Sequence, residues 1–336
     1  MKVLLLRRQS FGGIATYSDH LLEGLREAGV AVRVEDVSDW IPNDTRGSFD
    51  KEVTKKLLPL AREYDLVHAF GYRAAWACAE ALGKKLPWIY TAYDLPKTTH
   101  PELVARLDKA RVGLAVSRAV KSALDEALVS GVKLLTPGIP RLPDPGNQEE
   151  CKESLGIDPD WQVILAMGSI EGPEGLDVLA DGMEEIWRRI PYVQLCLASS
   201  DGRKDYWENH VVLADRPDRV SIFGKVKGKE KLFGAADLVV VPARVAGFSM
   251  VALEAMSLGT PSLVRRAGGL SDLVDERFSG LCFEDDEDLS RVLASGLQAT
   301  ITLESMRNAC RVRFEERHDF EACIAAHEAV YRRAVS

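Results

Sequence analysis

Residues 242–261 read PARVAGFSMVALEAMSLGTP, and this stretch decides the fold more than any other part of the chain. It follows a short apolar run, Leu238–Val241, that is typical of a buried strand. A loop containing glycine comes next. The pattern then predicts a helix over residues 249–258, with Gly259 as its C-terminal stop. A helix that begins directly after such a loop offers its N-terminus to phosphate oxygens.

Glu254 lies inside this predicted helix. Its neighbours three and four positions away are Met250, Val251, Ser257 and Leu258, so its carboxylate lies on a largely apolar face. A carboxylate in that setting is either buried with a partner or lines a cleft. Both readings are compatible with the sequence.

Short apolar runs alternate with amphipathic segments along the whole chain, which predicts parallel strands joined by helices. The expected helices include residues 14–28 and 72–82. The expected strands are residues 3–6, 30–34, 66–70, 88–91 and 112–116, then 163–167, 193–197, 220–223, 238–241 and 262–265. The fold class is therefore α/β, with two Rossmann-like, doubly wound parallel sheets.

Residues 137–146 contain four prolines and two glycines and are the expected linker between the two halves. The predicted domains are residues 1–140 and 141–315, followed by a C-terminal helix, 316–336, expected to pack back on the first domain. Parallel sheets bind ligands at the carboxyl ends of their strands, so two such domains are expected to face each other across a cleft.

Composition narrows the class of protein. The 336 residues carry a net charge of −8, which disfavours general nucleic-acid binding. The apolar run at the start is cut short by Arg7 and Arg8, and no run reaches the ~18 apolar residues of a membrane span, so a cytoplasmic protein is expected. The six scattered cysteines predict buried free thiols. The histidines have no metal-ligand spacing, so no metal is expected.

The acidic run at residues 284–288 predicts a solvated turn and helix start.

Gly12 and Gly13 follow the first predicted strand and open a helix. Glycines at this point allow a phosphate or sugar to approach the backbone, although a tight strand-to-helix turn explains them equally well. The chain has no GxGxxG motif, which disfavours a nicotinamide cofactor, and no GxxxxGK[ST] loop of the ATPase type.

The succession of motifs resembles glycosyltransferase family 4, whose members have the GT-B architecture of two Rossmann-like domains. The resemblance covers nearly the whole length. It is carried by Gly12-Gly13, residues 67–71, 115–117, 136–140 and 167–168, 236–242, 247–261 and Gly268-Gly269. It implies transfer of a sugar from a nucleotide diphosphate donor, UDP- or GDP-linked, with retention of anomeric configuration and without a further cofactor.

The resemblance also implies roles for individual residues. Glu254 would hold the donor ribose in the second domain, and Tyr93 is the second residue expected at the reaction centre. The acceptor would contact the first domain near Gly12, Gly13 and Tyr93. The residues expected to bind the donor are Gly12, Gly13, Ser169, Lys225, Arg244, Gly247, Phe248, Ser249, Met250, Val251 and Glu254.

Four positions depart from the family pattern. Ala246 stands where the first of two glutamates is usual, and Ser169 and Glu174 replace an arginine and a lysine that contact the diphosphate. Tyr93 aligns with a histidine of the first domain. Other cations could substitute, namely Arg7, Arg8, Arg244, Arg265 and Arg266. The lysines of residues 224–231 predict a local basic loop that is either solvated or in contact with phosphate or a membrane surface. His68 could face the cleft or be a packed, hydrogen-bonded core residue.

These replacements motivate a second hypothesis, a catalytically silent GT-B homologue that binds a nucleotide, a glycan or a partner protein. A phosphorylase or epimerase on the same fold is a third, because one fold hosts many chemistries. Nucleotide base, sugar, acceptor and oligomeric state stay open. Contact with a membrane is expected to be peripheral at most.

Overall fold

A computed structural model describes residues 1–8, 12–40, 46–96, 101–168, 174–199, 204–224 and 228–336. The chain forms two compact units, Met1–Pro140 with His318–Ser336, and Arg141–Arg317. Residues 135–147 contain neither helix nor strand, in the region where the prolines predict a linker. Prolines favour such extended backbone because they lack an amide donor and restrict the residue before them.

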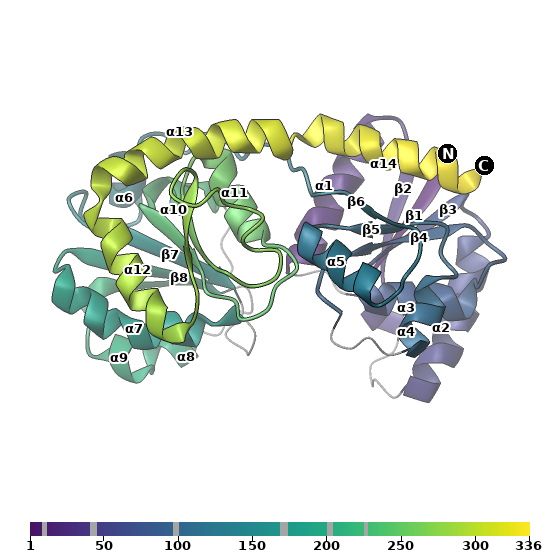
Figure 1. Ribbon diagram of the computed structural model, residues 1–336, viewed down its shortest axis with the longest axis horizontal. Helices are drawn as coiled ribbons and strands as arrows, with labels where there is room; N and C mark the ends of the chain where they lie inside the picture. The colour runs from purple at the N-terminus through teal and green to yellow at the C-terminus, as the bar shows by residue number, and fades with distance from the viewer. Residues whose placement is uncertain (9–11, 41–45, 97–100, 169–173, 200–203, 225–227) are drawn as a thin grey trace. The chain divides into compact units, whose positions relative to one another are not determined.

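The first unit, as far as it is described, has one parallel sheet of six strands in the order β2-β1-β3-β4-β5-β6 (Figure 1). Its strands are β1 Lys2–Arg7, β2 Ala31–Asp36, β3 Leu66–Phe70, β4 Trp88–Ala92, β5 Gly113–Ala115 and β6 Val132–Leu134. Its helices are α1 Gly13–Glu27, the short 3₁₀ turn Val37–Trp40, α2 Arg46–Ala61, α3 Gly71–Ala81, α4 Pro101–Leu107, α5 Arg118–Glu126 and α14 Phe320–Val335.

The second unit likewise has a six-stranded parallel sheet in its described part, ordered β12-β11-β10-β7-β8-β9. Its strands are β7 Gln162–Gly168, β8 Val193–Ser199, β9 Val220–Phe223, β10 Leu238–Val241, β11 Ser262–Arg265 and β12 Gly280–Phe283. Its helices are α6 Gln148–Ser154, α7 Leu176–Arg189, α8 Lys204–Glu208, α9 Val211–Ala214, the 3₁₀ turn Pro217–Arg219, α10 Glu230–Ala235, α11 Met250–Leu258, α12 Asp286–Gln298 and α13 Thr300–Arg317.

Both sheets confirm the predicted α/β class with two Rossmann-like units. The central strands are continuous apolar runs because helices cover both faces of each sheet. In the second unit α7 packs on α12, whereas α11 packs on α13 and α10 (Figure 1). The cysteines are free and buried, as expected. The acidic run is an exposed turn that starts α12, where Asp285 accepts a hydrogen bond from the amide of Asp288.

Two edge strands were not predicted. β6 has only three residues, is partly exposed and contains Lys133. β12 begins with Gly280. Neither presents the run of four or more apolar residues that marks a buried strand. β12 is nevertheless largely buried, and its Phe283 side chain belongs to the core of the unit. Each strand pairs with a single neighbour, β5 or β11.

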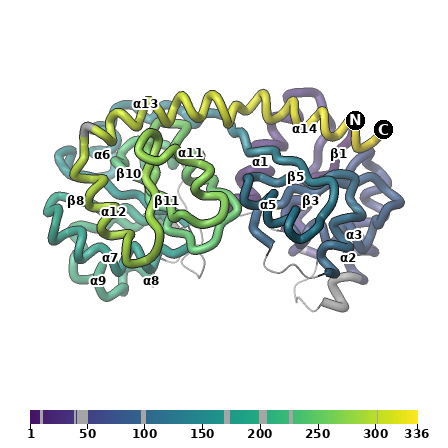
Figure 2. Tube along the Cα trace, viewed as in Figure 1, coloured from purple at the N-terminus to yellow at the C-terminus, as the bar shows by residue number. Residues whose placement is uncertain are grey.

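The C-terminal helix α14 packs on α1 and β3 within the first unit, as the trace in Figure 2 shows. A buried polar network joins it to the sheet. His68 on β3 lies with Nδ1 2.7 Å from the Tyr331 hydroxyl of α14 and Nε2 2.8 Å from the Thr91 hydroxyl. All three side chains are buried. His68 is therefore a packed core histidine, which settles the alternative left open by the sequence.

We expect the free energy of unfolding to fall as the pH is lowered from 7 toward 5. Burial holds the pKa of His68 well below its usual range, so the unfolded state takes up the proton first as the pH falls through about 6.5. One such group contributes a limiting slope of about 1.4 kcal/mol per pH unit. Urea unfolding at several pH values measures this slope. In the His68→Asn variant the unfolding free energy should depend on pH less steeply. An unchanged slope would mean that His68 is not the group responsible.

Candidate functional site

The candidate site lies at the carboxyl edge of the second unit's sheet. β10 and β7 are hydrogen-bonded neighbours and run parallel, so their carboxyl ends, Val241 and Gly168, lie at the same edge. The loop that follows Val241 leads into α11. In an open parallel sheet this edge is where ligands bind, because the loops and helix N-termini there surround a hollow.

The helix α11 is built as its sequence predicts. Ser249 is the N-cap, and its hydroxyl accepts a hydrogen bond from the amide of Ala252 at 3.2 Å. Gly259 ends the helix with φ 79°, a left-handed conformation that glycine adopts without a Cβ penalty. Gly247, Phe248 and Met250 are buried, whereas Val251 is half-buried. The amides of the first helical residues, Met250 and Val251, have no intrahelical acceptor.

Glu254 is buried, with 2% of its surface exposed, and its carboxylate forms an ion pair with the Lys229 ammonium. Burial raises the pKa of Glu254, and the positive charge of Lys229 acts in the opposite direction. The Lys229 side chain is 31% exposed, so the pair extends from the interior toward solvent. Of the two readings of this residue, the structure supports a buried carboxylate with a partner.

Arg244 lies in the loop before α11 and makes a bidentate ion pair with Asp177 in the first turn of α7. The two N–O distances are 2.8 and 3.1 Å. Asp286 is a second, longer partner at 3.6 Å and also pairs with buried Arg265. Arg265 in turn donates a hydrogen bond to the Pro242 carbonyl. This network braces the loop between β10 and α11 against its neighbours, which is a structural task for the Arg244 guanidinium.

Gly12, Gly13 and Tyr93 are brought together in the first unit, at the carboxyl ends of β1 and β4. A Cβ atom at Gly13 would lie 2.5 Å from the Tyr93 hydroxyl oxygen, so glycine is required for this close approach. Tyr93 itself is 6% exposed. Gly12 has φ 83° and caps the N-terminus of α1. Gly13 and Tyr93 thus lie side by side, and the resemblance had placed both, with Gly12, near the acceptor.

Other predicted residues have different surroundings. Ser169 and Lys225 lie outside the described residues. Glu174 is exposed, and its Oε2 would be 3.5 Å from a Cβ atom at Gly168, beside the end of β7. Arg7 is buried in ion pairs with Asp19 and Asp36, and Arg266 pairs with Glu276 and Glu284. Arg7, Arg265 and Arg266, suggested as replacement cations, therefore support the fold.

Lys229 is the site residue that sequence reasoning missed. It belongs to the lysine-rich run of residues 224–231, which reads as a local basic loop. A signal was present, since a carboxylate on an apolar helix face requires a partner and this run supplies the nearest unassigned cations. Asp177, the partner of Arg244, was also missed, and nothing in its local sequence identifies it.

Over the described ranges, no three His, Cys, Asp or Glu side chains gather as metal ligands would. The absence of a metal requirement remains a prediction. No helix in the described part of the chain is long and apolar enough to cross a bilayer.

Gly175 lies against Pro242, in the loop between β10 and α11, and a larger residue at this position is expected to destabilise the fold. It caps α7 with φ 69°, and a Cβ atom there would collide with the Pro242 carbonyl. We expect Gly175→Ala to lower the free energy of unfolding more than Gly156→Ala does, by at least about 1 kcal/mol. Gly156 is the matched control because it has φ 72° but open space around its Cα. Urea unfolding of both variants makes the comparison, and equal losses would show that the contact with Pro242 is unimportant.

Comparison with known proteins relates this chain to glycosyltransferases. Residues 147–313 match the family model of glycosyl transferases group 1. The D-inositol 3-phosphate glycosyltransferase of Segniliparus rotundus is 26% identical, in an alignment that covers 96% of this chain and 85% of that protein.

Solved structures give the same result for the fold. Sucrose-phosphate synthase from Thermosynechococcus elongatus superposes with a TM-score of 0.83 at 19% identity, over 99% of this chain and 98% of that one. The protein HepE of Anabaena, in complex with UDP, superposes with a TM-score of 0.80 at 20% identity, over 99% and 100%. The chain thus has the GT-B fold and is a homologue of glycosyltransferases, with the group 1 sequence pattern confined to residues 147–313 of its second unit.

Proposed function

We propose that the protein is a retaining glycosyltransferase whose second unit binds a nucleotide diphosphate sugar at the carboxyl edge of its sheet. The observation that carries the proposal is Glu254, a buried carboxylate on α11 whose cationic partner, Lys229, is partly exposed. Burying a carboxylate is costly unless its oxygens are hydrogen-bonded. A site with that cost is typical of ligand recognition rather than of packing.

Glu254 would bind the donor ribose. A carboxylate accepts several hydrogen bonds, so a pair with Lys229 leaves acceptor positions for two ribose hydroxyls. Each charge-assisted hydrogen bond contributes about 1.5–3 kcal/mol. Lys229 would act by keeping the carboxylate ionised in its buried surroundings.

The diphosphate would lie at the start of α11. The amides of Gly247, Phe248, Met250 and Val251 surround that start, and the helix dipole favours negative charge there by about 0.3–1 kcal/mol. Amide donors aimed at the leaving phosphate would stabilise charge that develops as the glycosidic bond breaks. The leaving phosphate would then assist deprotonation of the acceptor, so no separate general base is needed. The acceptor is proposed to contact the first unit near Gly12, Gly13 and Tyr93.

UDP is the nucleotide to test first. The fold-level likeness to HepE, which has been solved with UDP and with UDP-glucose, supports that choice, and GDP is the comparison. The identity of the sugar and of the acceptor follows from neither sequence nor fold.

Glu254→Gln should weaken UDP binding about ten-fold or more, because the amide accepts fewer and weaker hydrogen bonds than the carboxylate. Isothermal titration calorimetry measures the dissociation constant for each protein. The matched control is Glu287→Gln, which removes the same charge from an exposed position in α12. Absence of UDP and GDP binding to the unaltered chain at millimolar concentration rejects the proposal, and unchanged affinity in the Glu254 variant rejects the role of that residue.

Lys229→Met should make UDP binding depend on pH. Loss of the ammonium removes the charge that opposes the effect of burial, so the pKa of Glu254 rises further and more of the carboxyl group is protonated near pH 7. The variant should therefore bind UDP more tightly as the pH rises from 7 to 9, whereas the unaltered chain should change less. A weaker but parallel pH profile would mean that Lys229 does not control the ionisation of Glu254.

A silent binding protein is the second candidate. Its support is Ala246, which has no carboxylate, together with the engagement of Arg244, Arg265 and Arg266 in ion pairs. Slow release of free glucose from UDP-glucose distinguishes the two, because an active transferase hydrolyses its donor when no acceptor is present. UDP binding without any hydrolysis would favour the silent homologue.

A further inference from the structure

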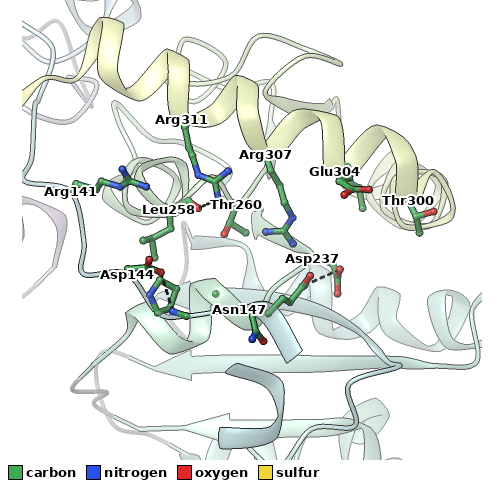
Figure 3. A pocket seen from close by; sticks show the side chains of 15 residues that line it. Arg141, Asp144, Asn147, Asp237, Leu258, Thr260, Thr300, Glu304, Arg307 and Arg311 are labelled. Atoms are coloured by element: carbon green, nitrogen blue, oxygen red, sulfur yellow. Dashed lines mark hydrogen bonds between the residues drawn. The ribbon is translucent and has the colours of Figure 1, made fainter. Parts of the chain in front are cut away.

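A hollow lies at the edge of the second unit's sheet opposite the candidate donor site. Its volume is about 550 Å³. Asp237 precedes β10 and Thr260 precedes β11, so the hollow is at the amino ends of strands whose carboxyl ends form the candidate donor site. Residues 141–148 and one side of α13 complete its lining (Figure 3). The two sites belong to one unit but to different edges of its sheet.

Three arginines line this hollow, namely Arg141, Arg307 and Arg311 (Figure 3). In the part of the chain that is described, no carboxylate lies within ion-pair distance of any of them, whereas Arg244, Arg265, Arg266 and Arg313 of the same unit all have such partners. Arg307 donates to the Ala236 carbonyl at 3.0 Å, and Arg311 donates to the Leu258 carbonyl at 3.3 Å. Arg311 also donates to the Asn308 side-chain oxygen at 3.4 Å. A guanidinium carries five N–H donors, so these bonds leave donors on both arginines for a ligand.

Arg307 and Arg311 are also close to each other. They are four positions apart on α13, where like charges repel. Both are half-buried, and burial lowers the pKa of Arg307, an effect that the charge of Asp237 opposes and that of Arg311 reinforces. Paired, partly desolvated cations are unfavourable without an anion, so this arrangement calls for a negatively charged partner.

The carboxylates of the lining already have partners of their own. Asp237 accepts hydrogen bonds from the Gln148 side chain at 3.0 Å and the Val163 amide at 2.8 Å, and its carboxylate lies 3.5 Å from the Lys152 ammonium. Asp144 accepts the Gly146 amide within its own turn. Glu304 is exposed. None of the three neutralises the arginines at contact distance.

A glycine at the end of α11 leaves room for the Arg311 side chain. A Cβ atom at Gly259 would lie 2.8 Å from the Arg311 Cζ and Nε atoms. The guanidinium can approach this closely only because the end of α11 has no side chain there. Gly259 thus allows the Arg311 guanidinium to lie where it lines the hollow.

We propose that this hollow is a binding site for a small phosphomonoester or a similarly compact dianion. Guanidinium groups match phosphate oxygens through paired hydrogen bonds, and three of them converge here without a contacting carboxylate. The volume is within the range of small-molecule sites. The inference is independent of the proposed transferase activity.

The hollow lies where the chain enters and leaves the second unit, so an anion bound there would contact both connections. Arg141 begins the segment that enters the second unit, and α13 is the element by which the chain leaves it. An anion held by Arg141 together with Arg307 and Arg311 would tie the entering segment to the leaving helix. Binding there would order both connections to the first unit.

Calorimetry with inorganic phosphate and with glycerol 3-phosphate, at constant ionic strength, tests the proposal on the full chain. We expect saturable binding that Arg311→Gln weakens about ten-fold or more. Arg141→Gln should also weaken binding and, because Arg141 is exposed, is expected to fold even if a change in α13 does not. Arg317→Gln, an exposed change on the same helix, is the matched control and should bind as the unaltered chain does.

Hydrogen exchange adds a local readout. Amides of residues 141–147 should exchange more slowly when glycerol 3-phosphate is bound. A separate titration with UDP reports on the donor site, so failure of the donor site and failure of this site are distinguishable. Absence of saturable binding, or equal affinity in the Arg311, Arg141 and Arg317 variants, would overturn the proposal.

Discussion

The ion pair between Glu254 and Lys229 is the interaction on which the site depends. A carboxylate that is 2% exposed is unfavourable in an apolar helix, and one partly exposed ammonium offsets only part of that cost. The proposed function gives this polar pair a ligand at the carboxyl edge of the sheet, whose hydroxyl groups would complete the hydrogen bonding of the carboxylate.

The scaffold around this pair is built to keep the loop between β10 and α11 in one place. Arg244 ties it to Asp177 on α7, Arg265 ties Pro242 to the start of α12, and Gly175 lets α7 approach Pro242 closely. Ser249 and Gly259 fix the two ends of α11. Gly259 also leaves room for the Arg311 side chain. The start of α11 thus lies at the candidate donor site, and its end lies at the hollow on the opposite edge of the sheet.

Much of this could be predicted from local sequence. Leu238–Val241 and Ser262–Arg265 are strands as predicted because continuous apolar runs mark strands covered on both faces. Ser249 and Gly259 were recognisable because capping chemistry is local. β6 was missed because it is short and partly exposed, and β12 because its apolar run is only three residues long.

The partners of charged side chains were the least predictable feature. The sequence indicates that Glu254 needs a cation, but only the packing of α10 beside α11 selects Lys229. The pairing of Arg244 with Asp177 spans 67 positions and leaves no local signal. The local pattern therefore identified the helix and its carboxylate, and the resemblance suggested a role for that carboxylate, whereas the network that supports them required the structure.

A crystal structure of the protein with UDP is the most direct test of the central claim. The account predicts the ribose hydroxyls on the Glu254 carboxylate, the diphosphate at the amides that begin α11, and Lys229 still beside Glu254. UDP bound elsewhere, or a Glu254–Lys229 pair that is unchanged and remote from any bound nucleotide, would contradict it.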